Sequence, residues 1–237
     1  MLPAAIIFDM DGVLVDSNPF HLRKWIDVFR AHEIPFDEQE LPKIIMGPAN
    51  DSIFRRFLGN DLTPEQLAEL GEELEQNFRR EIGPHARAFP GVRLFVEECH
   101  AHGIAMAVAS AAIAKNVNFL VSALGLRDYF RAMMTANEIT HPKPHPEIYL
   151  KTANRLGVEP AGCLVFEDSF VGIEAAKRAG MICVAIASTF PAEDLRRETH
   201  ADLILPSFEA VSLQTVHQFF NGASTLSGTR GPSPGSR

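Results

Sequence analysis

The sequence predicts an α/β protein built on a parallel sheet, with a block of helices inserted after the first strand. Two patterns predict this fold. In the second half of the chain, short apolar runs alternate with helical patterns, which is typical of βαβ units. Residues 16–85 instead hold helical patterns and no good strand. A crossover between parallel strands needs only about a dozen residues, so the surplus predicts a helical subdomain.

Five apolar runs are expected to form the strands, because an uninterrupted run of this length is typical of a strand buried on both faces. These runs are residues 4–8, 104–109, 132–135, 163–166 and 182–187. Helices are expected between the later strands, and each predicted helix ends near a glycine stop. These helices cover residues 115–124, 146–156 and 172–179.

The inserted block is expected to form an all-helical cap. Its helical patterns cover residues 21–32, 42–45, 51–58 and 64–81. We assign residues 1–15 and 86–221 to the core domain that holds the sheet, and residues 16–85 to the cap. Residues 222–237 carry almost no apolar side chains and are expected to be a disordered tail.

The charge balance excludes several classes of partner. The chain has 237 residues, a net charge of −8 and a pI near 5.6. Its mean field repels phosphate backbones and anionic membranes, so neither is an expected partner.

No apolar run reaches the roughly 18 residues of a membrane span, and the first residues lack the basic segment of a signal peptide. Three well-separated cysteines predict buried free thiols in a reducing compartment. We therefore expect a cytoplasmic protein, and a monomer.

Two carboxylates follow the first predicted strand. Asp9 and Asp11 are two residues apart, and Gly12 allows a sharp turn whose backbone N–H groups can face an anion. Carboxylates this close repel each other unless a cation joins them, and Mg²⁺ prefers oxygen ligands of this kind. The alternative is an ordinary acidic turn at the end of a strand.

A second acidic pair, Glu167 and Asp168, follows the fourth predicted strand. If the first and fourth strands are neighbours, four carboxyl groups converge at one edge of the sheet. A simpler role is also open, because Asp168 or Ser169 could cap the helix that follows. Capping explains one of the two acids and leaves the other without a role.

Two further strand ends carry groups suited to an anion. Lys143 stands among three prolines, which stiffen its loop. Ser110 follows the second strand, and small residues beginning with Ala111 leave backbone donors open. Either could be an ordinary surface residue when taken alone. Because all four features follow separate parallel strands, we expect one crevice with a metal ion and phosphate anchors.

The ordered set of motifs resembles the haloacid dehalogenase superfamily, in its branch of β-phosphoglucomutase-like phosphatases. The resemblance covers roughly residues 6–205 and begins with Asp-x-Asp-Gly-x-Leu-x-Asp-Ser at Asp9. It continues through Ser110, Lys143 followed by proline, and the pair that starts at Glu167. The resemblance implies a Rossmann-like, doubly wound sheet with strand order 3-2-1-4-5, a helical cap after strand one, and Mg²⁺ as cofactor.

The resemblance also implies a role for each residue. Asp9 matches a nucleophile that forms an aspartyl-phosphate. Asp11 matches the general acid/base, whose backbone carbonyl also binds the metal, and it argues against the dehalogenases of the superfamily. Asp168 matches a metal ligand, and Glu167 matches an acid beside the metal. The phosphate anchors correspond to Ser110, Ala111 and Lys143.

The cap departs from the β-phosphoglucomutases. His21 and Trp25 match positions of those enzymes, but residues 47–53 lack the arginine of the segment that holds a second phosphate. Asn50 is the nearest polar substitute, and asparagine cannot clamp phosphate as arginine does. His21 and Asn50 are candidate substrate contacts, although His21 could be a surface residue and Trp25 could simply pack the cap. We favour hydrolysis of a small phosphorylated metabolite, such as a sugar phosphate.

Two other functions remain open. One is a β-phosphoglucomutase that interconverts β-glucose 1-phosphate and glucose 6-phosphate. The other is a phospho-accepting module without turnover, because receiver domains also place an acidic pair and a lysine on a doubly wound sheet. Receiver domains are about half as long and carry the phosphorylated aspartate after the third strand, which argues against this function.

Overall fold

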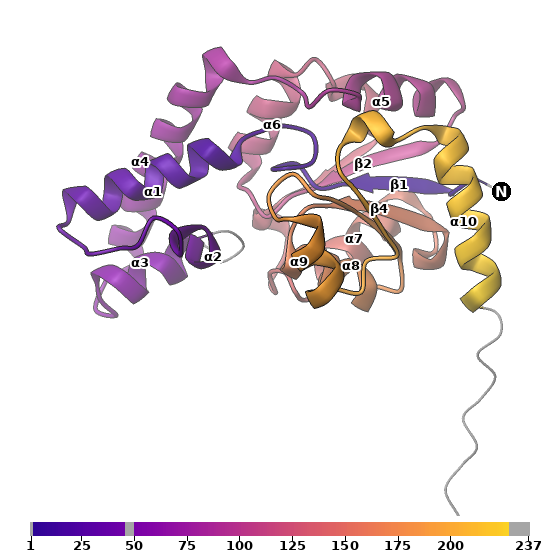
Figure 1. Cartoon of the computed structure of the whole chain (residues 1–237). Coiled ribbons are helices and arrows are strands. Elements are labelled where there is room, and N and C mark those ends of the chain that lie inside the picture. Colours follow the sequence, from indigo (N-terminus) through magenta and orange to yellow (C-terminus); the bar gives the residue numbers. More distant parts are fainter. Residues whose placement is uncertain (1, 46–49, 228–237) are drawn as a thin grey trace, which may run out of the picture.

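The centre of the molecule is a six-stranded parallel sheet (Figure 1). The computed structural model describes residues 2–45 and 50–227. The strand order β3-β2-β1-β4-β5-β6 confirms the predicted order 3-2-1-4-5 and adds a sixth strand at one edge. The strands are β1 (Ala5–Phe8), β2 (Ala105–Ala109), β3 (Ala132–Met134), β4 (Cys163–Glu167), β5 (Ile182–Ile186) and β6 (Leu203–Leu205).

Helices cover both faces of the sheet. Successive side chains of a strand point to opposite faces, so a strand made only of apolar residues has two faces to bury. In β1, Ile6 and Phe8 join one apolar layer, while Ala5 and Ile7 join the other. The first layer is covered by α5 (Val92–Ala101), α6 (Ala114–Ala123) and α10 (Leu213–Ser227). The second is covered by α7 (Glu147–Leu156), α8 (Phe170–Arg178) and α9 (Ala192–Glu198). Burial on both faces explains why the strands read as uninterrupted apolar runs.

Phenylalanine rings fill the middle of the first layer. Phe8 of β1 stacks on Phe166 of β4 with 5.4 Å between ring centroids. Phe95 of α5 meets Phe166 edge-on at 5.5 Å, and Phe208 lies 4.8 Å from the same ring. Such aromatic pairs each contribute about 0.5–1.5 kcal/mol beyond the burial of their area. The cluster therefore joins the two strands whose C-terminal ends carry the acidic pairs.

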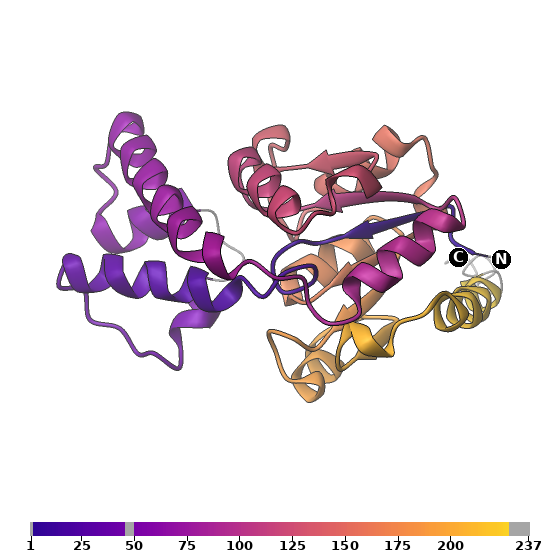
Figure 2. The same ribbon diagram turned by 90° about the horizontal axis from the view of Figure 1, so that it is seen from above.

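The α-helices between β1 and α5 lie together to one side of the sheet (Figure 2). These helices are α1 (Asn18–Ala31), α2 (Leu41–Ile45), α3 (Asn50–Leu58) and α4 (Pro64–Ile82). They share an apolar cluster of their own, in which Trp25, Phe29 and Phe54 are buried. Helix α4 begins with a capping box, in which Thr63 and Gln66 bond reciprocally. A separate apolar cluster supports the proposed division into a core and a cap.

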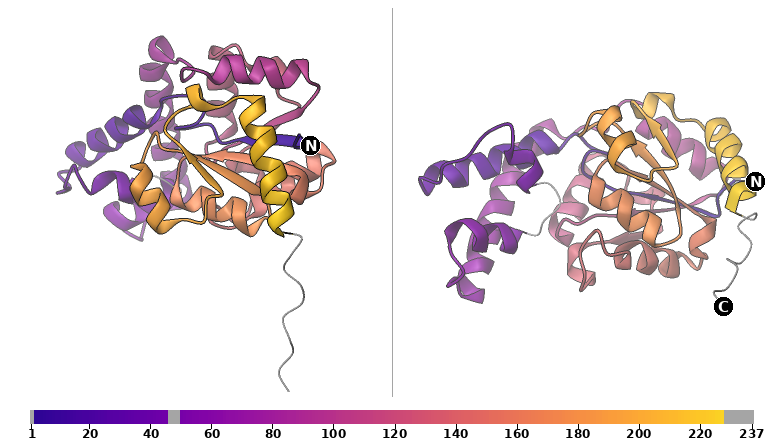
Figure 3. Two further views of the ribbon diagram at one scale, coloured as in Figure 1. Left: turned by 45° about the vertical axis from the view of Figure 1, so that its right-hand side comes forward. Right: turned by 60° about the horizontal axis from the view of Figure 1, so that its bottom comes forward.

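Three α-helices and one strand of the described residues are not predicted from the sequence: α5, α9, α10 and β6. Strand β6 has only three residues at the edge of the sheet, so its apolar run is too short to stand out. Helix α10 packs on the core through Leu213, Val216 and Phe220, and lies beside the N-terminal end of β1 (Figure 3). It continues to Ser227, and the disorder expected from residue 222 stays a prediction. Residues 228–237 lie outside the described residues.

Two expectations about the kind of protein can be compared with the fold. Among residues 2–45 and 50–227, no helix combines the length and the apolar character needed to cross a bilayer. The thiols of Cys99, Cys163 and Cys183 are buried and free, as the spacing of the cysteines predicts.

Substitution of Phe95 tests the contribution of the aromatic cluster. Phe95 is 2% exposed, whereas its neighbour Leu94 is 74% exposed. We expect Phe95→Ala to lower the free energy of unfolding by about 3–5 kcal/mol, because it removes a buried ring and leaves a cavity. Leu94→Ala should change it by less than about 0.5 kcal/mol. Urea denaturation measures both values, and equal losses in the two variants would contradict this packing.

Candidate active site

A buried cluster of charges lies at the C-terminal edge of the sheet. The ammonium of Lys143 donates to Asp9 Oδ1 at 2.7 Å and to Glu167 Oε1 at 2.6 Å. All three side chains are buried. Buried carboxylates this close together are costly without a compensating charge, and the lysine supplies one. Lys143 therefore holds both acids in place.

Strand register brings the predicted residues to one level. Strand β1 pairs with β4 so that Phe8 lies opposite Phe166. Asp9 and Glu167 each follow these residues by one position, so they reach the same height. Strand β2 pairs with the other side of β1 and ends immediately before Ser110. The segments singled out in the sequence thus meet at one edge of the sheet, and the loop between β3 and α7 brings the lysine to them.

Five donors hold the carboxylate of Glu167. Its Oε1 accepts hydrogen bonds from Lys143 and from the hydroxyl of Tyr149, both at 2.6 Å. Its Oε2 accepts from the backbone N–H of Asp168 and from the N–H and hydroxyl of Ser169. Burial opposes ionisation, but the charge of Lys143 and these hydrogen bonds hold the pKa of Glu167 below its usual value. Glu167 is therefore a fixed negative partner for the lysine.

Asp9 and Asp168 are shifted in the opposite direction. Burial, together with the neighbouring carboxylates, raises the pKa of Asp9 well above its ordinary value in spite of Lys143. Burial, followed by the charge of Glu167, raises the pKa of Asp168 to about 7. One lysine therefore does not neutralise the negative charge gathered here. A bound divalent cation would favour the ionised form of both aspartates.

The donor set fits a metal ion that prefers oxygen. Carboxylate oxygens of Asp9, Glu167 and Asp168 lie within 4.8 Å of one another. Such a set suits Mg²⁺. Because five donors already occupy Glu167, the two aspartates are better placed to bind an ion directly. Asp11 contributes no side-chain oxygen to this group, and the role of its backbone carbonyl stays a prediction.

Asp11 connects the core with the first helix of the cap. Its Oδ1 accepts a hydrogen bond from the Ser17 hydroxyl at 2.5 Å and lies 3.0 Å from His21 Nε2. Burial opposes ionisation, but His21 and Ser17 hold the pKa of Asp11 below its ordinary value. The His21 ring stacks on Phe78 of α4, with 4.2 Å between centroids. The predicted cap residue His21 therefore reaches the acidic centre through Asp11.

Asp168 packs directly against the turn that carries Asp11. A β-carbon on Gly12 would lie 1.9 Å from Asp168 Oδ2, and the φ of Gly12 is +76°, so only glycine fits. The same oxygen accepts from Asn18 Nδ2 at 3.2 Å and from the Thr189 hydroxyl. The sequence gives no signal for Asn18 or Thr189, because each is far along the chain from the acid it contacts.

The predicted phosphate anchors lie around the same point. Ser110 is buried, and its hydroxyl oxygen accepts a hydrogen bond from the Ala112 N–H at 3.0 Å. Lys143 Nζ lies 3.4 Å from the carbonyl oxygen of Ala109, the residue before Ser110. Ala111 lines the cavity that faces Asp9. This placement is compatible with a phosphate group held between the lysine and the loop after β2.

A cavity of about 630 Å³ lies between the core and the cap, a size suited to a small metabolite. Both predicted cap contacts, His21 and Asn50, line it. Trp25 also lines it, and packs 4.9 Å from the ring of Phe54 in the cap cluster. Residues 46–49, which form part of the segment without the expected arginine, lie outside the described residues. The core side of the cavity includes Asp9, Asp11, Lys143 and Asp168.

A polar network lines the cap side of the cavity. Glu75 Oε1 accepts from Lys24 Nζ at 2.8 Å and from Asn50 Nδ2 at 2.6 Å. Its other oxygen accepts from Asn116 Nδ2 at 2.5 Å, and Arg79 donates to Asn116 Oδ1 at 2.6 Å. Asn116 belongs to core helix α6, so Glu75 links the cap to the core. Of these residues only Asn50 is predicted from the sequence, because the others lie on ordinary helical patterns.

The chain is similar to several known proteins. Fructose-1-phosphate phosphatase YqaB of Escherichia coli is 33% identical over 185 residues, which cover 77% of this chain and 96% of that protein. β-Phosphoglucomutase of Clostridium difficile has a TM-score of 0.83 at 25% identity, covering 95% and 100% of the two chains. CbbY of Rhodobacter sphaeroides, in complex with xylulose-(1,5)bisphosphate, has a TM-score of 0.76 at 26% identity, covering 89% and 97%.

The doubly wound sheet and the acidic centre beneath a helical cap define a Rossmann-like α/β protein with a cap. The chain belongs to the haloacid dehalogenase-like hydrolase family, whose sequence profile matches residues 6–186. Within that family it falls in the β-phosphoglucomutase-like phosphatase branch, and it is a phosphoric monoester hydrolase. The family and the enzyme class expected from the motifs are thereby confirmed.

Substitution of Gly172 tests how tightly the side chain of Glu167 is packed. A β-carbon at Gly172 would lie 1.8 Å from Glu167 Oε1, whose carboxylate is buried and fixed by five donors. We expect Gly172→Ala to lower the free energy of unfolding by about 1–3 kcal/mol through overpacking. Gly71→Ala in helix α4 meets no neighbour and should raise it by roughly 0.5–1 kcal/mol. Chemical denaturation compares the two, and a neutral Gly172→Ala would refute the tight packing.

Asp168 makes the stability of the metal-free protein depend on pH. Its pKa of about 7 in the folded state exceeds the 3.8 of a free aspartate. The folded state therefore binds the proton more tightly, so its stability falls as pH rises from about 4 to about 7. In chelator, we expect Asp168→Asn to raise the melting temperature relative to the wild type more at pH 8 than at pH 5.

The matched control for the loss of one carboxylate is Asp61→Asn, at an exposed position of the cap. This variant should show no such difference between the two pH values. The same gain for Asp168→Asn at pH 5 and pH 8 would contradict the raised pKa.

Proposed function

We propose that the protein is a Mg²⁺-dependent phosphatase that hydrolyses a small phosphorylated metabolite through an aspartyl-phosphate on Asp9. The observation that carries this proposal is the Asp9–Lys143 pair, because both residues line the cavity. Lys143 holds Oδ1 of Asp9, so Oδ2 is the oxygen that attacks phosphorus, in line with the leaving oxygen. The fixed positive charge lets an anionic substrate approach a carboxylate.

Asp9 and Asp168 are the proposed side-chain ligands of Mg²⁺, with Glu167 beside them. When bound, the ion neutralises charge on the phosphoryl oxygens and on the attacking carboxylate. The oxygen-only donor set and the raised pKa values of Asp9 and Asp168 support this assignment. Glu167 keeps Lys143 in position, and the five donors to the Glu167 carboxylate in turn hold Glu167 in place.

Asp11 is the proposed acid and base. Because its contacts hold its pKa low, Asp11 first takes up a proton on substrate binding and then gives it to the leaving oxygen as the new bond to Asp9 forms. In the second step its carboxylate takes a proton from the water that attacks phosphorus, which releases phosphate and restores Asp9. The contacts with Ser17 and His21 hold the carboxyl group of Asp11 in one orientation. The phosphoryl oxygens are held by Ser110, Ala111 and Lys143.

The cap side of the cavity favours a monophosphate over a bisphosphate. Each of the three lysines that line the described part of the cavity is paired with a carboxylate. Lys143 pairs with Asp9, Lys24 with Glu75 at 2.8 Å, and Lys115 with Glu72 at 2.9 Å. A second phosphate would need a free cation, and the buried carboxylate of Glu75 would repel it. This distribution of charge supports net hydrolysis rather than a mutase.

A neutral group rich in hydroxyls fits the same surface. Glu75 can accept hydrogen bonds from hydroxyl groups, while Asn50 and Asn116 can both donate and accept. Among the relatives, the Escherichia coli protein is named a fructose-1-phosphate phosphatase, and the CbbY structure contains a phosphorylated sugar. We therefore propose a sugar phosphate or a polyol phosphate as the substrate.

Replacement of Asp9 tests the nucleophile. We expect Asp9→Asn to lower kcat for phosphate release by on the order of 10³-fold or more, with the melting temperature retained. A screen over hexose phosphates, polyol phosphates, nucleotides and pyrophosphate would first identify a substrate. Release should require Mg²⁺ and stop in chelator. Mass spectrometry would check that the asparagine has not deamidated.

The matched control is Asp27→Asn, at an exposed position of α1, which should keep full activity. Undiminished hydrolysis by Asp9→Asn would reject the proposed nucleophile. With β-glucose 1-phosphate as substrate, formation of glucose 6-phosphate without free phosphate would instead identify a mutase. A stable phosphorylated protein without turnover would identify a phospho-accepting module.

A further inference from the structure

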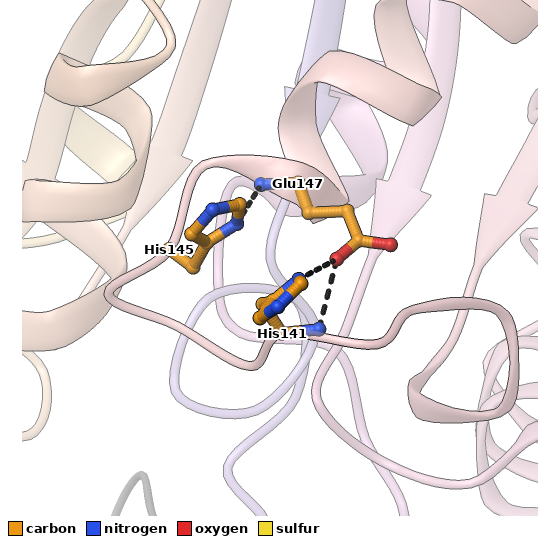
Figure 4. Close-up of side chains that lie close together, drawn as sticks. All are labelled: His141, His145 and Glu147. Atoms are coloured by element: carbon orange, nitrogen blue, oxygen red, sulfur yellow. Dashed lines mark hydrogen bonds and ion pairs between the residues drawn. The ribbon is translucent and has the colours of Figure 1, made fainter.

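Two histidines on the loop that carries Lys143 lie close to a glutamate in the first turn of helix α7 (Figure 4). His141 Nδ1 is 3.0 Å from Glu147 Oε2, and the rings of His141 and His145 are 4.6 Å apart. His145 Nδ1 accepts a hydrogen bond from the backbone N–H of Glu147 at 3.3 Å. One potential ligand atom from each of the three residues lies within 4.8 Å of the other two.

The carboxylate of Glu147 is held in a fixed position. Its Oε1 accepts from the backbone N–H of Thr140 at 3.0 Å and pairs with Lys151 Nζ at 2.6 Å. Its Oε2 accepts from the backbone N–H of His141 at 2.8 Å. Lys151 therefore neutralises one oxygen, while the other faces the imidazole of His141.

The backbone around both histidines is also restrained. Prolines occupy positions 142, 144 and 146, and the N–H of His145 bonds to the carbonyl of Pro142 at 2.9 Å. The side chain of His141 is 63% exposed, and His145 is also exposed, so the rings can turn without disturbing the core. Because the backbone is already restrained, ion binding has to order the two rings and little of the backbone.

We propose that His141, His145 and Glu147 bind a transition-metal ion of the zinc class, at a site separate from the carboxylate centre. A tetrahedral ion with bonds of about 2.0 Å holds two ligand atoms about 3.3 Å apart, close to the His141–Glu147 distance. The ion takes the place of the proton between these two atoms, and that proton goes to solvent. His145 turns to give the third ligand, and water fills the fourth position.

The ligand types separate this site from the carboxylate centre. Imidazole nitrogen suits zinc, nickel and copper, whereas a set made only of carboxylates suits magnesium. The two histidines flank Lys143, whose ammonium holds Asp9 and Glu167. An ion bound here therefore ties both ends of the Lys143 loop to the first turn of helix α7.

Cobalt(II) is a suitable probe because tetrahedral Co²⁺ absorbs visible light. Metal-free protein would be saturated with Mg²⁺, so that the carboxylate centre is occupied, and then titrated with Co²⁺. We expect one Co²⁺ per chain with a tetrahedral spectrum, displaced by Zn²⁺. His141→Ala and His145→Ala should each weaken the affinity by about 10-fold or more. His200→Ala, at an exposed histidine elsewhere, is the matched control and should bind as the wild type does.

Anomalous scattering from crystals soaked in zinc would locate the ion, with a peak expected between His141, His145 and Glu147. Equal Co²⁺ affinity in the wild type and in both histidine variants would overturn the proposal, as would a zinc peak confined to the carboxylate centre. Thermal melts in the absence of metal would establish that each variant is folded. The outcome does not depend on the proposed phosphatase activity, because binding is measured without substrate.

Discussion

The buried bridge from Lys143 to Asp9 and Glu167 is the constraint on which the rest of the centre depends. Without the ammonium, two carboxylates would face each other away from water, which is strongly unfavourable. The bridge requires Glu167 to stay in place, and Gly172 leaves the space that its carboxylate occupies. It also requires the lysine to arrive at the right height, which the proline-rich loop after β3 provides. The pairing of β1 with β4 then places Asp9 and Glu167 at the same height, so the sheet determines where the acidic centre forms.

The cap reaches this centre through polar contacts, and Phe78 and Ile82 of α4 also join the apolar layer of the core. His21 meets Asp11, and Glu75 meets Asn116 on core helix α6. The first contact links the cap to the proposed acid and base, and the second lines the side of the cavity away from the acids. In the proposed function, chemistry and recognition occupy opposite sides of one cavity, and each side is built by different secondary-structure elements.

Most of the fold follows from local patterns, and the residues of the centre follow from their position after strands. The apolar runs predict β1 to β5 because these strands are buried on both faces. Strand β6 and helix α10 escape because one is very short and the other ends in a polar stretch. The sequence predicts three residues of the centre because they are charged and stand beside apolar runs or prolines: Asp9, Lys143 and Asp168. Tyr149 and Glu75 do not, because their roles depend on contacts between elements distant in the chain.

The apolar interior of the core and that of the cap are formed by different side chains. The layers on either side of the sheet support the charged centre, whereas Trp25, Phe29 and Phe54 belong to the cap alone. Mutations that repack this cap cluster would therefore leave the layers on the sheet in place. Such a division lets natural selection vary the choice of metabolite while the reaction itself is conserved, which would allow one ancestral enzyme to give rise to many specificities.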